Sequence, residues 1–586
     1  MSSGTPGGQV VTDRQRPMSP MTGGQLVVDM LASLGVTHVF GVPGGQTLAI
    51  TDAILTTPGI EFVTARHEGG AAVMADAYGR LTGTPGVCLA TTGPGATNLM
   101  TGVGGALRDS SPALIITCNN NAENIHKDDA QNADHVELFR SLTKWSRLVA
   151  HCSSIEQAME EAYVQAMTGN PGPAHLDFAR DAIESTVEFE PAVPDEHPAR
   201  RWVGQRPHAD PAVLAAVANR LAGAERPVLW LGNGCNRANA GPAALALAEA
   251  LSIPVLTTFN GIGAVPTSHP LVFGALSRMG TNLTTRVIQE ADLVLAVGNS
   301  LNAVSTGRWS LYLPDIVQID IDPGMIGRYY GKQTLGVVGD ARSAMDTIRE
   351  RLRDRAESAR ARRAGWIADL SEARQAWWKT TAPGQPPARD GAGEPVSPAD
   401  VVRVLRGVAP DDTLLIPDAG NPGVWSYLWD IRQIGSYIKP VGFGNMGFAV
   451  PAAVAAAVID PQRPVLALVG DGSLGMSLGE LETLARVGGR VCVVVLNDAS
   501  YGNIRQEQIV HFEGRTVGVD YTVTDFGVVS SALGIPGSRV QGLAELARGA
   551  REALSGDHPV LLDVLIDREV NAWTYPAFRP YDPEQG

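Results

Sequence analysis

One stretch of the chain, residues 464–508, limits the possible fold more than any other. An apolar run over 464–469 has the length and β-branched content of a buried strand, and it ends at Gly470-Asp471-Gly472. A helical pattern follows, and a second apolar run over 491–496 ends at Asn497-Asp498. Strand, glycine turn, helix and strand in this order are typical of a parallel sheet, whose ligands gather at the carboxyl ends of the strands.

Asp471 and Asp498 each follow one of these strands, so we expect both carboxylates at the same edge of the sheet. Such oxygen ligands suit Mg²⁺, which takes one or two carboxylates together with phosphate oxygens and water. Gly470 and Gly472 would let backbone N–H groups approach an anion at the start of the helix. The stretch predicts a site for a magnesium-bound phosphate; an ordinary βαβ turn with two solvated acids is the alternative.

The spacing of this stretch is similar to a known cofactor motif. Gly470-Asp471-Gly472, then 24 residues, then Asn497-Asp498 resembles the thiamine-diphosphate motif of the superfamily of acetolactate synthase, benzoylformate decarboxylase and pyruvate oxidase. The resemblance implies thiamine diphosphate and Mg²⁺ as cofactors, with Asp471, Asp498 and the main-chain carbonyl of Ser500 as metal ligands. Relatives usually have Asn at position 498, so this chain adds a charge beside the diphosphate.

Alternating strand and helix patterns predict an α/β protein with three doubly wound domains and mainly parallel sheets. The resemblance covers residues 21–572 and implies the identity of each domain. These are an N-terminal pyrimidine-binding domain (21–185), a central Rossmann-like domain (207–350) and a C-terminal domain that binds thiamine diphosphate and Mg²⁺ (397–572).

The segments outside these domains are predicted from their composition. Residues 1–20 are expected to be a disordered tail, and 186–206 and 381–396 are expected to be proline-rich linkers. Residues 345–380, rich in Ala, Arg and Glu, are expected to form an exposed helix. The C-terminal tail, 573–586, carries four aromatic residues and is expected to dock, either over the active site or elsewhere on the surface.

Composition excludes several classes of partner. The net charge of −15 argues against nucleic acid and acidic membrane surfaces as partners. No run approaches the ~18 apolar residues of a membrane span, and the N-terminus lacks a secretory pattern. The five cysteines have no metal-ligand spacing and read as buried thiols of a cytoplasmic protein.

The resemblance also implies the acid that activates the cofactor. Glu68, in the segment VTARHEGGAAVMADAYGR, matches the glutamate that contacts the aminopyrimidine ring in relatives. A carboxyl at a strand-to-helix junction in apolar surroundings suits this task, because burial raises its pKa. The alternative is an ordinary acid at a helix start. In relatives this glutamate reaches the cofactor of a neighbouring subunit, which implies a homodimer or a dimer of dimers with active sites at the subunit interface.

Further cofactor contacts are carried over by position. Met446 matches the apolar wedge that bends the cofactor, with a core methionine as the alternative, and Gly444 matches a residue whose carbonyl accepts from the pyrimidine amino group. Met476 would line the cofactor or pack in the core. The other predicted contacts are Gly420, Asn421, Gly470, Gly472, Ser473, Asn503 and Ile504.

The substrate side of the site is predicted from the first domain. Gly45 and Gln46 lie on the loop expected to face the thiazolium, and Gln131 matches a glutamine of the acetolactate synthase FQEAD element. Ile504 stands where pyruvate decarboxylase has a proton-handling Glu, and Thr91 stands where benzoylformate decarboxylase has a catalytic His. A site with few proton donors favours attack on a second carbonyl over simple decarboxylation.

We therefore expect an enzyme that decarboxylates a 2-oxo acid and transfers the acyl carbanion equivalent to an acceptor carbonyl. The alternatives are a C–C lyase of the 2-hydroxyacyl-CoA or benzoin type, a simple 2-oxo acid decarboxylase, and a non-catalytic binding subunit. Glu507, where acetolactate synthase has a Trp, speaks against a faithful acetolactate synthase.

We expect the central domain to bind no nucleotide. The turn Gly232-Asn-Gly234 after a strand is a weak glycine-rich pattern. Relatives use this domain for FAD, for ADP or for neither. Residues 297–303 do not match the flavin-contacting element of acetolactate synthases, so we expect no FAD.

Overall fold

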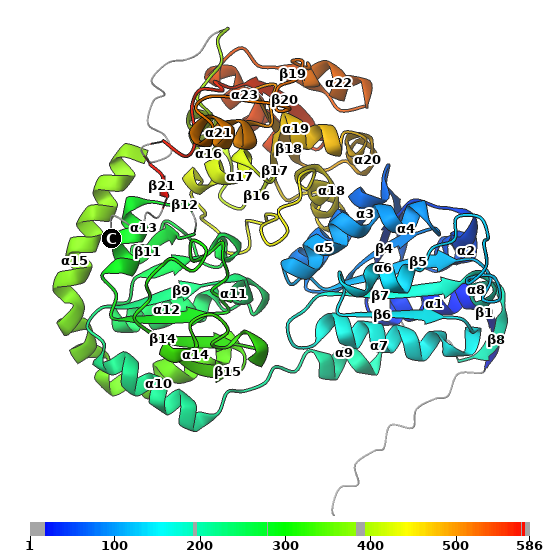
Figure 1. Cartoon of the computed structure of the whole chain (residues 1–586), viewed down its shortest axis with the longest axis horizontal. Helices are drawn as coiled ribbons and strands as arrows, with labels where there is room; N and C mark the ends of the chain where they lie inside the picture. The colour runs from blue at the N-terminus through cyan, green and yellow to red at the C-terminus, as the bar shows by residue number, and fades with distance from the viewer. Residues whose placement is uncertain (1–17, 191–195, 278, 382–392, 576, 581–586) are drawn as a thin grey trace, which may run out of the picture.

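The computed structural model describes residues 18–190, 196–277, 279–381, 393–575 and 577–580. Three parallel sheets, each flanked by helices, form three lobes that meet along shared faces (Figure 1). The predicted α/β class with mainly parallel sheets is confirmed.

The first sheet has six strands in the order β3-β2-β4-β5-β7-β6. Its strands are β2 (His38–Gly41), β3 (Glu61–Thr64), β4 (Gly86–Ala90), β5 (Ala113–Asn119), β6 (Trp145–Val149) and β7 (Pro173–Ala179). Its helices are α1 (Gly23–Ser33), α2 (Leu48–Thr56), α3 (Glu68–Thr82), α4 (Pro94–Asn98), α5 (Met100–Arg108), α6 (His135–Arg140), α7 (Ile155–Met167) and α8 (Arg180–Glu184). Strands β4, β5 and β7 are buried on both faces, which explains their continuous apolar runs.

The second sheet also has six strands, in the order β11-β10-β9-β13-β14-β15. The strands are β9 (Pro227–Leu231), β10 (Val255–Thr257), β11 (Val272–Ala275), β13 (Leu293–Val297), β14 (Asp315–Asp320) and β15 (Thr334–Val338). The helices are α10 (Pro211–Gly223), α11 (Asn233–Arg237), α12 (Gly241–Leu251), α13 (Asn282–Gln289), α14 (Ala341–Arg351) and α15 (Ala356–Thr381).

The third sheet has five strands in the order β16-β17-β18-β20-β19. They are β16 (Leu414–Pro417), β17 (Val465–Gly470), β18 (Val491–Asn497), β19 (Gly537–Arg539) and β20 (Val560–Leu565). The helices are α16 (Pro398–Val408), α17 (Asn421–Trp425), α18 (Ala449–Ile459), α19 (Asp471–Met476), α20 (Glu480–Val487), α21 (Gly502–His511), α22 (Phe526–Ala532) and α23 (Leu543–Ser555). The helix expected between the strands at 464–469 and 491–496 is broken between α19 and α20, at 477–479.

One hydrophobic core joins the first and third domains. Helices α3 and α18 pack face to face between the two sheets, and the small side chains of the alanine-rich α18 allow a close approach. Buried Glu480 of α20 fixes the contact, because its carboxylate accepts hydrogen bonds from the backbone N–H groups of Arg66 (3.1 Å) and His67 (3.0 Å). The backbone just before Glu68 is thus held by the third domain of its own chain.

Two predictions for the connecting segments need correction. Residues 1–17 lie outside the described residues, but Ser19–Thr22 forms strand β1 and pairs with β8 (Thr186–Phe189), so the end of the expected tail is ordered into a sheet. The expected linker 186–206 accordingly begins with β8 and contains helix α9 (Pro198–Val203). Strands that pair across such a distance in sequence leave no local pattern, which explains why β1 and β8 were missed.

The single exposed helix expected at 345–380 is instead the end of α14 followed by α15, and α15 is exposed on one face and buried on the other. Helix α15 lies against the central domain (Figure 1), with Leu370 fully buried and Arg363 fully buried beside it. The Arg363 guanidinium donates to the carbonyls of Leu221 and Leu251, both at 2.6 Å, at the ends of α10 and α12. An arginine that caps two helix C-termini contributes to packing rather than solvation. Residues 382–392 of the second expected linker lie outside the described residues.

The C-terminal tail docks on the third domain, within the described residues. Phe578 and Tyr575 pack against Trp425 of α17 with ring centroids at 5.6 and 5.0 Å. Strand β21 (Arg579–Pro580) pairs with β12 (Met279–Gly280) of the central domain. The tail therefore ties two domains together, and residues 581–586 lie outside the described residues.

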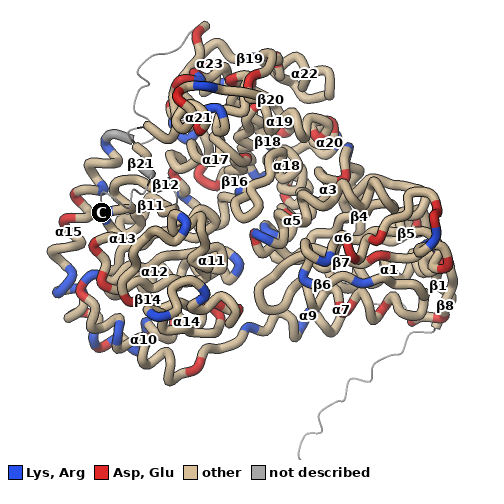
Figure 2. The backbone as a smooth tube through the Cα atoms, viewed as in Figure 1, with Lys and Arg blue, Asp and Glu red and all other residues tan. Residues whose placement is uncertain are grey.

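Acidic and basic positions are interspersed along the backbone of all three domains (Figure 2). Among the described helices, none combines the length and the apolar character needed to cross a membrane.

Candidate active site

A cavity of about 630 Å³ opens at the carboxyl ends of β16, β17 and β18. Three helices, α17, α19 and α21, begin at residues that line its wall, and helix starts of this kind favour anions. All predicted site residues of the third domain line this cavity. They are Gly420, Asn421, Gly444, Met446, Gly470, Asp471, Gly472, Ser473, Met476, Asp498, Ser500, Asn503 and Ile504.

Two carboxylates, those of Asp471 and Asp498, line the cavity. Asp471 Oδ1 accepts a hydrogen bond from the N–H of Gly472 (2.9 Å), whereas Oδ2 is buried and has no partner. Asp498 Oδ1 accepts from the N–H of Ser500 (3.1 Å). Burial and the adjacent charge of Asp498 raise the pKa of Asp471 to about 7, and burial also raises the pKa of Asp498.

This arrangement fits a divalent cation better than a solvated turn. A bound cation would give the orphaned Asp471 oxygen a partner and offset the repulsion between the two acids. In the described part of the chain, no cluster of three His, Cys, Asp or Glu side chains is placed to hold a metal. Two carboxylates and a backbone carbonyl leave coordination positions for phosphate oxygens and water, as Mg²⁺ sites usually do.

The upper wall of the cavity is apolar and open. Met446, Met476 and Ile504 line it and are 40%, 54% and 49% exposed. Neither methionine is therefore a core residue, which removes that alternative for both. Gly444, two residues before Met446, has a φ of +70°, a region that an L-residue rarely adopts. Large apolar side chains exposed around a cavity favour a ligand or a partner surface that covers them.

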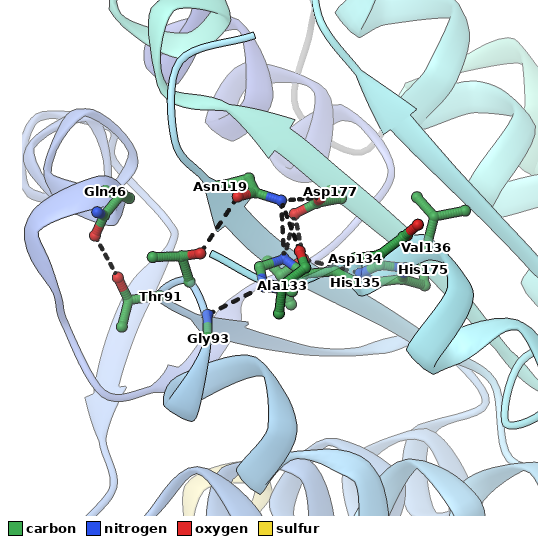
Figure 3. Close-up of polar contacts among 12 residues, drawn as sticks. Gln46, Thr91, Gly93, Asn119, Ala133, Asp134, His135, Val136, His175 and Asp177 are labelled. Atoms are coloured by element: carbon green, nitrogen blue, oxygen red, sulfur yellow. Dashed lines mark hydrogen bonds and ion pairs between the residues drawn. The ribbon is translucent and has the colours of Figure 1, made fainter. Parts of the chain in front are cut away.

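The predicted residues of the first domain do not reach this cavity within one chain. Gly45 begins a 3₁₀ turn, and the side-chain oxygen of the next residue, Gln46, accepts from Thr91 Oγ1 (2.8 Å) (Figure 3). Gln131 has a φ of +59°, and its carbonyl accepts from Thr92 Oγ1 (3.2 Å). None of the described residues that line the cavity comes from the first domain.

Glu68 begins helix α3, where the preceding residue, His67, caps the helix. Its Oε2 accepts a hydrogen bond from Asn98 Nδ2 at 3.0 Å. The side chain is half-buried within one chain, so the apolar enclosure expected for it is not complete there.

Sequence reasoning missed part of the cavity wall. Tyr501 and Gly502 directly follow the predicted metal ligands, so their position in the motif could have identified them. Residues 517–519 are brought in by a backbone hydrogen bond from Tyr501 N–H to the carbonyl of Val519 (2.8 Å), which no local pattern predicts. The remaining residues missed are Ala419, Pro422, Leu496, Gln508 and Ile566.

The glycine-rich turn of the central domain packs against protein backbone. A Cβ on Gly232 would lie 2.1 Å from the carbonyl oxygen of Gly298, and one on Gly234 would lie 2.6 Å from the Gly298 Cα. These glycines are needed for the close approach of two backbone segments, which accounts for them without a nucleotide phosphate.

Comparison with known proteins agrees with this geometry. Family models of thiamine pyrophosphate enzymes match three segments: the N-terminal TPP binding domain at residues 21–138, the central domain at 214–348 and the C-terminal TPP binding domain at 418–564.

Full-length relatives are similar along almost the whole chain. The acetolactate synthase large subunit of Corynebacterium glutamicum is 31% identical over 96% of this chain and 90% of the relative. The acetolactate synthase isozyme 2 large subunit of Escherichia coli is 32% identical over 94% of this chain and 97% of the relative. The mitochondrial acetolactate synthase of Schizosaccharomyces pombe is 31% identical over 94% and 84%, respectively. The chain belongs to the thiamine pyrophosphate enzymes and is acetolactate synthase-like.

Proposed function

We propose that this protein is a thiamine-diphosphate- and Mg²⁺-dependent carboligase. It decarboxylates a 2-oxo acid and transfers the acyl carbanion equivalent to the carbonyl of an acceptor. The observation that carries the proposal is the cavity that combines the Asp471 Oδ2 atom, which has no hydrogen-bond partner, with the exposed Met446 side chain. The relatives named acetolactate synthase support the same reaction class.

Each part of the site has a distinct task in this proposal. Asp471, Asp498 and the carbonyl of Ser500 hold Mg²⁺, and the N–H groups at the starts of α19 and α21 receive the diphosphate. Bound thiamine diphosphate supplies the nucleophilic carbon and stabilises the negative charge left by decarboxylation. Met446 keeps the cofactor bent, and the Glu68 carboxyl holds a proton at the pyrimidine ring.

Carboligation is favoured over simple decarboxylation by the scarcity of proton donors. Among the described residues that line the cavity there is no Glu, His or Lys, and both of its aspartates are assigned to the metal. The hydroxyl of Thr91, on the first-domain side, already donates a hydrogen bond to Gln46. A site without a free acid protonates the product of decarboxylation slowly, so an acceptor carbonyl has time to react.

The proposal includes an assembly, a substrate class and a compartment. Because Glu68 and the cavity do not meet in one chain, we propose that two copies complete each active site between them. The small-molecule substrate is a 2-oxo acid, and the central domain carries no FAD. The five cysteines are all buried free thiols, as suits a protein of the reducing cytoplasm.

A panel of 2-oxo acids tests the function. The purified protein with thiamine diphosphate and Mg²⁺ is expected to release CO₂ and form a coupled product, and omission of either cofactor should abolish both. Release of CO₂ with only free aldehyde would instead identify a decarboxylase, and cleavage of a 2-hydroxyacyl-CoA without CO₂ would identify a lyase. Glu68→Gln is the matched control, because it replaces the carboxyl group with an amide and keeps the shape of the side chain. A yellow preparation would contradict the absence of FAD.

A further inference from the structure

The first domain contains a buried polar network beneath its active-site loops, which the proposed function does not yet use. Asp177 of β7 is 1% exposed and lies at its centre. Its carboxylate accepts from the hydroxyl of Thr117 (2.7 Å), from Asn119 Nδ2 (2.9 Å) and from the ring of His135 (2.8 Å) (Figure 3). A buried carboxylate with three donors is well satisfied and rigidly oriented.

The hydrogen-bond partners of His135 determine which of its ring nitrogens carries the proton. The backbone N–H of Gly93 can only donate, so the Nε2 atom that it contacts at 3.0 Å must accept. Nδ1 then carries the ring proton and donates it to Asp177. His135 is fully buried, at the first position of α6, and its Nδ1 also lies 3.5 Å from Asn119 Nδ2.

Gly93 is the turning point of the loop that joins β4 to α4. Its φ is +64°, and a Cβ there would lie 2.3 Å from the carbonyl oxygen of Gln131, so the two loops are in contact. Two residues before Gly93, Thr91 donates to Gln46. Five residues after it, Asn98 donates to Glu68.

We propose that His135 and Asp177 are positioning residues, which hold the Gly93 loop so that Glu68 and Gln46 face the cofactor of the partner copy. The geometry that carries this is the path from Asp177 through the His135 ring to the Gly93 N–H and along α4 to Asn98. This inference rests on the proposed function, because it assigns Glu68 and Gln46 to the reaction. It adds two buried residues on α6 and β7 that touch neither substrate nor cofactor.

Two substitutions separate the two hydrogen bonds of the ring. In His135→Gln the side-chain oxygen takes the place of Nε2 and can still accept from Gly93, whereas the bond to Asp177 is lost. In His135→Asn the side-chain NH₂ takes the place of Nδ1 and can still donate to Asp177, whereas the bond to Gly93 is lost. Both variants keep a polar group in the buried position, which limits the damage to folding.

His175 provides the matched control. It is also fully buried, next to Asp177 in the chain, and burial holds its pKa down to about 3, so it is neutral. Its ring contacts the hydroxyls of Thr117 (2.9 Å) and Ser146 (2.7 Å). Thr117 also donates to Asp177, and Ser146 also donates to the carbonyl of Val136, so His175→Asn perturbs the same buried network. It leaves the contact between His135 and Gly93 in place, which makes it a strict control for that contact.

The readout is the rate at which the thiazolium C2 proton of bound thiamine diphosphate exchanges with deuterium, together with the Kd of the cofactor. We expect His135→Asn to slow the exchange at least about tenfold, the factor that one lost hydrogen bond gives, with little change in Kd. His135→Gln keeps the contact with Gly93 but loses the anchor on Asp177, so its exchange should be slowed less than that of His135→Asn. His175→Asn should exchange at nearly the wild-type rate.

Three outcomes would overturn the positioning role. They are wild-type exchange in His135→Asn, equal slowing in His135→Gln, or equal slowing in His175→Asn, which would indicate a general effect of buried polar loss. In each of these the wild-type protein still binds and activates the cofactor, so the proposed function stands. A wild-type protein that fails to bind thiamine diphosphate would instead overturn the proposed function and this inference together.

Discussion

At the scale of single residues, two aspartates carry the proposed magnesium site of the cavity. Asp471 and Asp498 follow neighbouring strands that pair in parallel register, Gly470 opposite Leu496, so the two carboxylates emerge at the same level of the sheet. Burial raises the pKa of both carboxyls, and for Asp471 the neighbouring charge of Asp498 raises it further. The chain keeps this arrangement although an amide at position 498 would repel less.

This pair gives a prediction about two substitutions. Asp471→Ala removes the oxygen that lacks a partner and should weaken Mg²⁺-dependent binding of thiamine diphosphate by at least roughly 10- to 100-fold. Loss of a residue that only hydrogen-bonds to a metal ligand already lowers metal affinity by this factor. Asp498→Asn keeps an oxygen ligand and relieves the repulsion, so Mg²⁺-dependent binding should be retained. Calorimetric titration with and without Mg²⁺ measures both. Wild-type cofactor affinity in Asp471→Ala would show that the metal is held elsewhere.

At the scale of elements, the parts with a local pattern could be predicted. The strands over 464–469 and 491–496, and the turns that end them, are specified by short apolar runs and adjacent glycines, and the third-domain half of the site followed from them. Elements that depend on distant partners could not be predicted. Strand β8 needs β1 as its partner, and the burial of Arg363 needs the carbonyl ends of α10 and α12.

The same limit applies to the site itself. Residues 517–519 reach the cavity through a hydrogen bond to a residue 18 positions earlier, Tyr501. His135 and Asp177 are 42 residues apart, and a buried histidine in a polar segment carries no sequence pattern that distinguishes it from an exposed one. Burial and pairing, rather than residue type, give these residues their roles.

The docked C-terminal segment supports an element of the active site. Phe578 is 2% exposed and packs on Trp425, in the helix whose first residue, Asn421, lines the cavity. Phe578→Ala should lower the free energy of unfolding by about 3 kcal/mol, as deletion of a buried aromatic ring usually does. It should also weaken cofactor binding, because α17 loses its support.

Val528→Ala is the control for this prediction. Val528 is 68% exposed on α22, so its truncation should change the free energy of unfolding by less than about 0.5 kcal/mol. Chemical denaturation of both variants gives the comparison. Equal losses in the two variants would mean that the docked segment contributes no specific packing.

At the scale of the whole molecule, the proposed active site draws on the first and third domains, and no described residue of the first domain lines the cavity within one chain. A mixing experiment tests whether two copies complete it. Glu68→Gln and Asp471→Ala are each expected to be inactive alone. Co-expressed, they should form mixed dimers in which one site has both an intact Glu68 and an intact Asp471.

Random pairing predicts that about a quarter of the sites are restored, since half of the dimers are mixed and each has one intact site. The activity of the co-purified mixture, relative to wild type, measures this fraction. If the mixture is as inactive as either parent, Glu68 and Asp471 act within the same chain.

The contact among the three domains has its own dependence on pH. Lys439 of the third domain is 8% exposed, and its Nζ lies 4.1 Å from the ring centroid of Phe259 in the central domain. Its carbonyl accepts from Arg80 of the first domain (2.8 Å). Burial lowers the pKa of Lys439 to about 7, against the opposing attraction of Asp109 and Asp418.

The sign of the effect follows from proton counts. Between pH 7 and about 10.4, the ordinary pKa of lysine, the unfolded chain holds a proton at position 439 that the native protein has released. Raising the pH through this window therefore favours the native state, by up to about 1.4 kcal/mol per pH unit for one proton. Lys439→Met removes this contribution, so its free energy of unfolding should rise less steeply with pH than that of the wild type. Denaturant titrations at intervals from pH 7 to 10 give the two slopes. Parallel curves would mean that Lys439 keeps its charge at the junction, and that the three domains meet around a protonated amine.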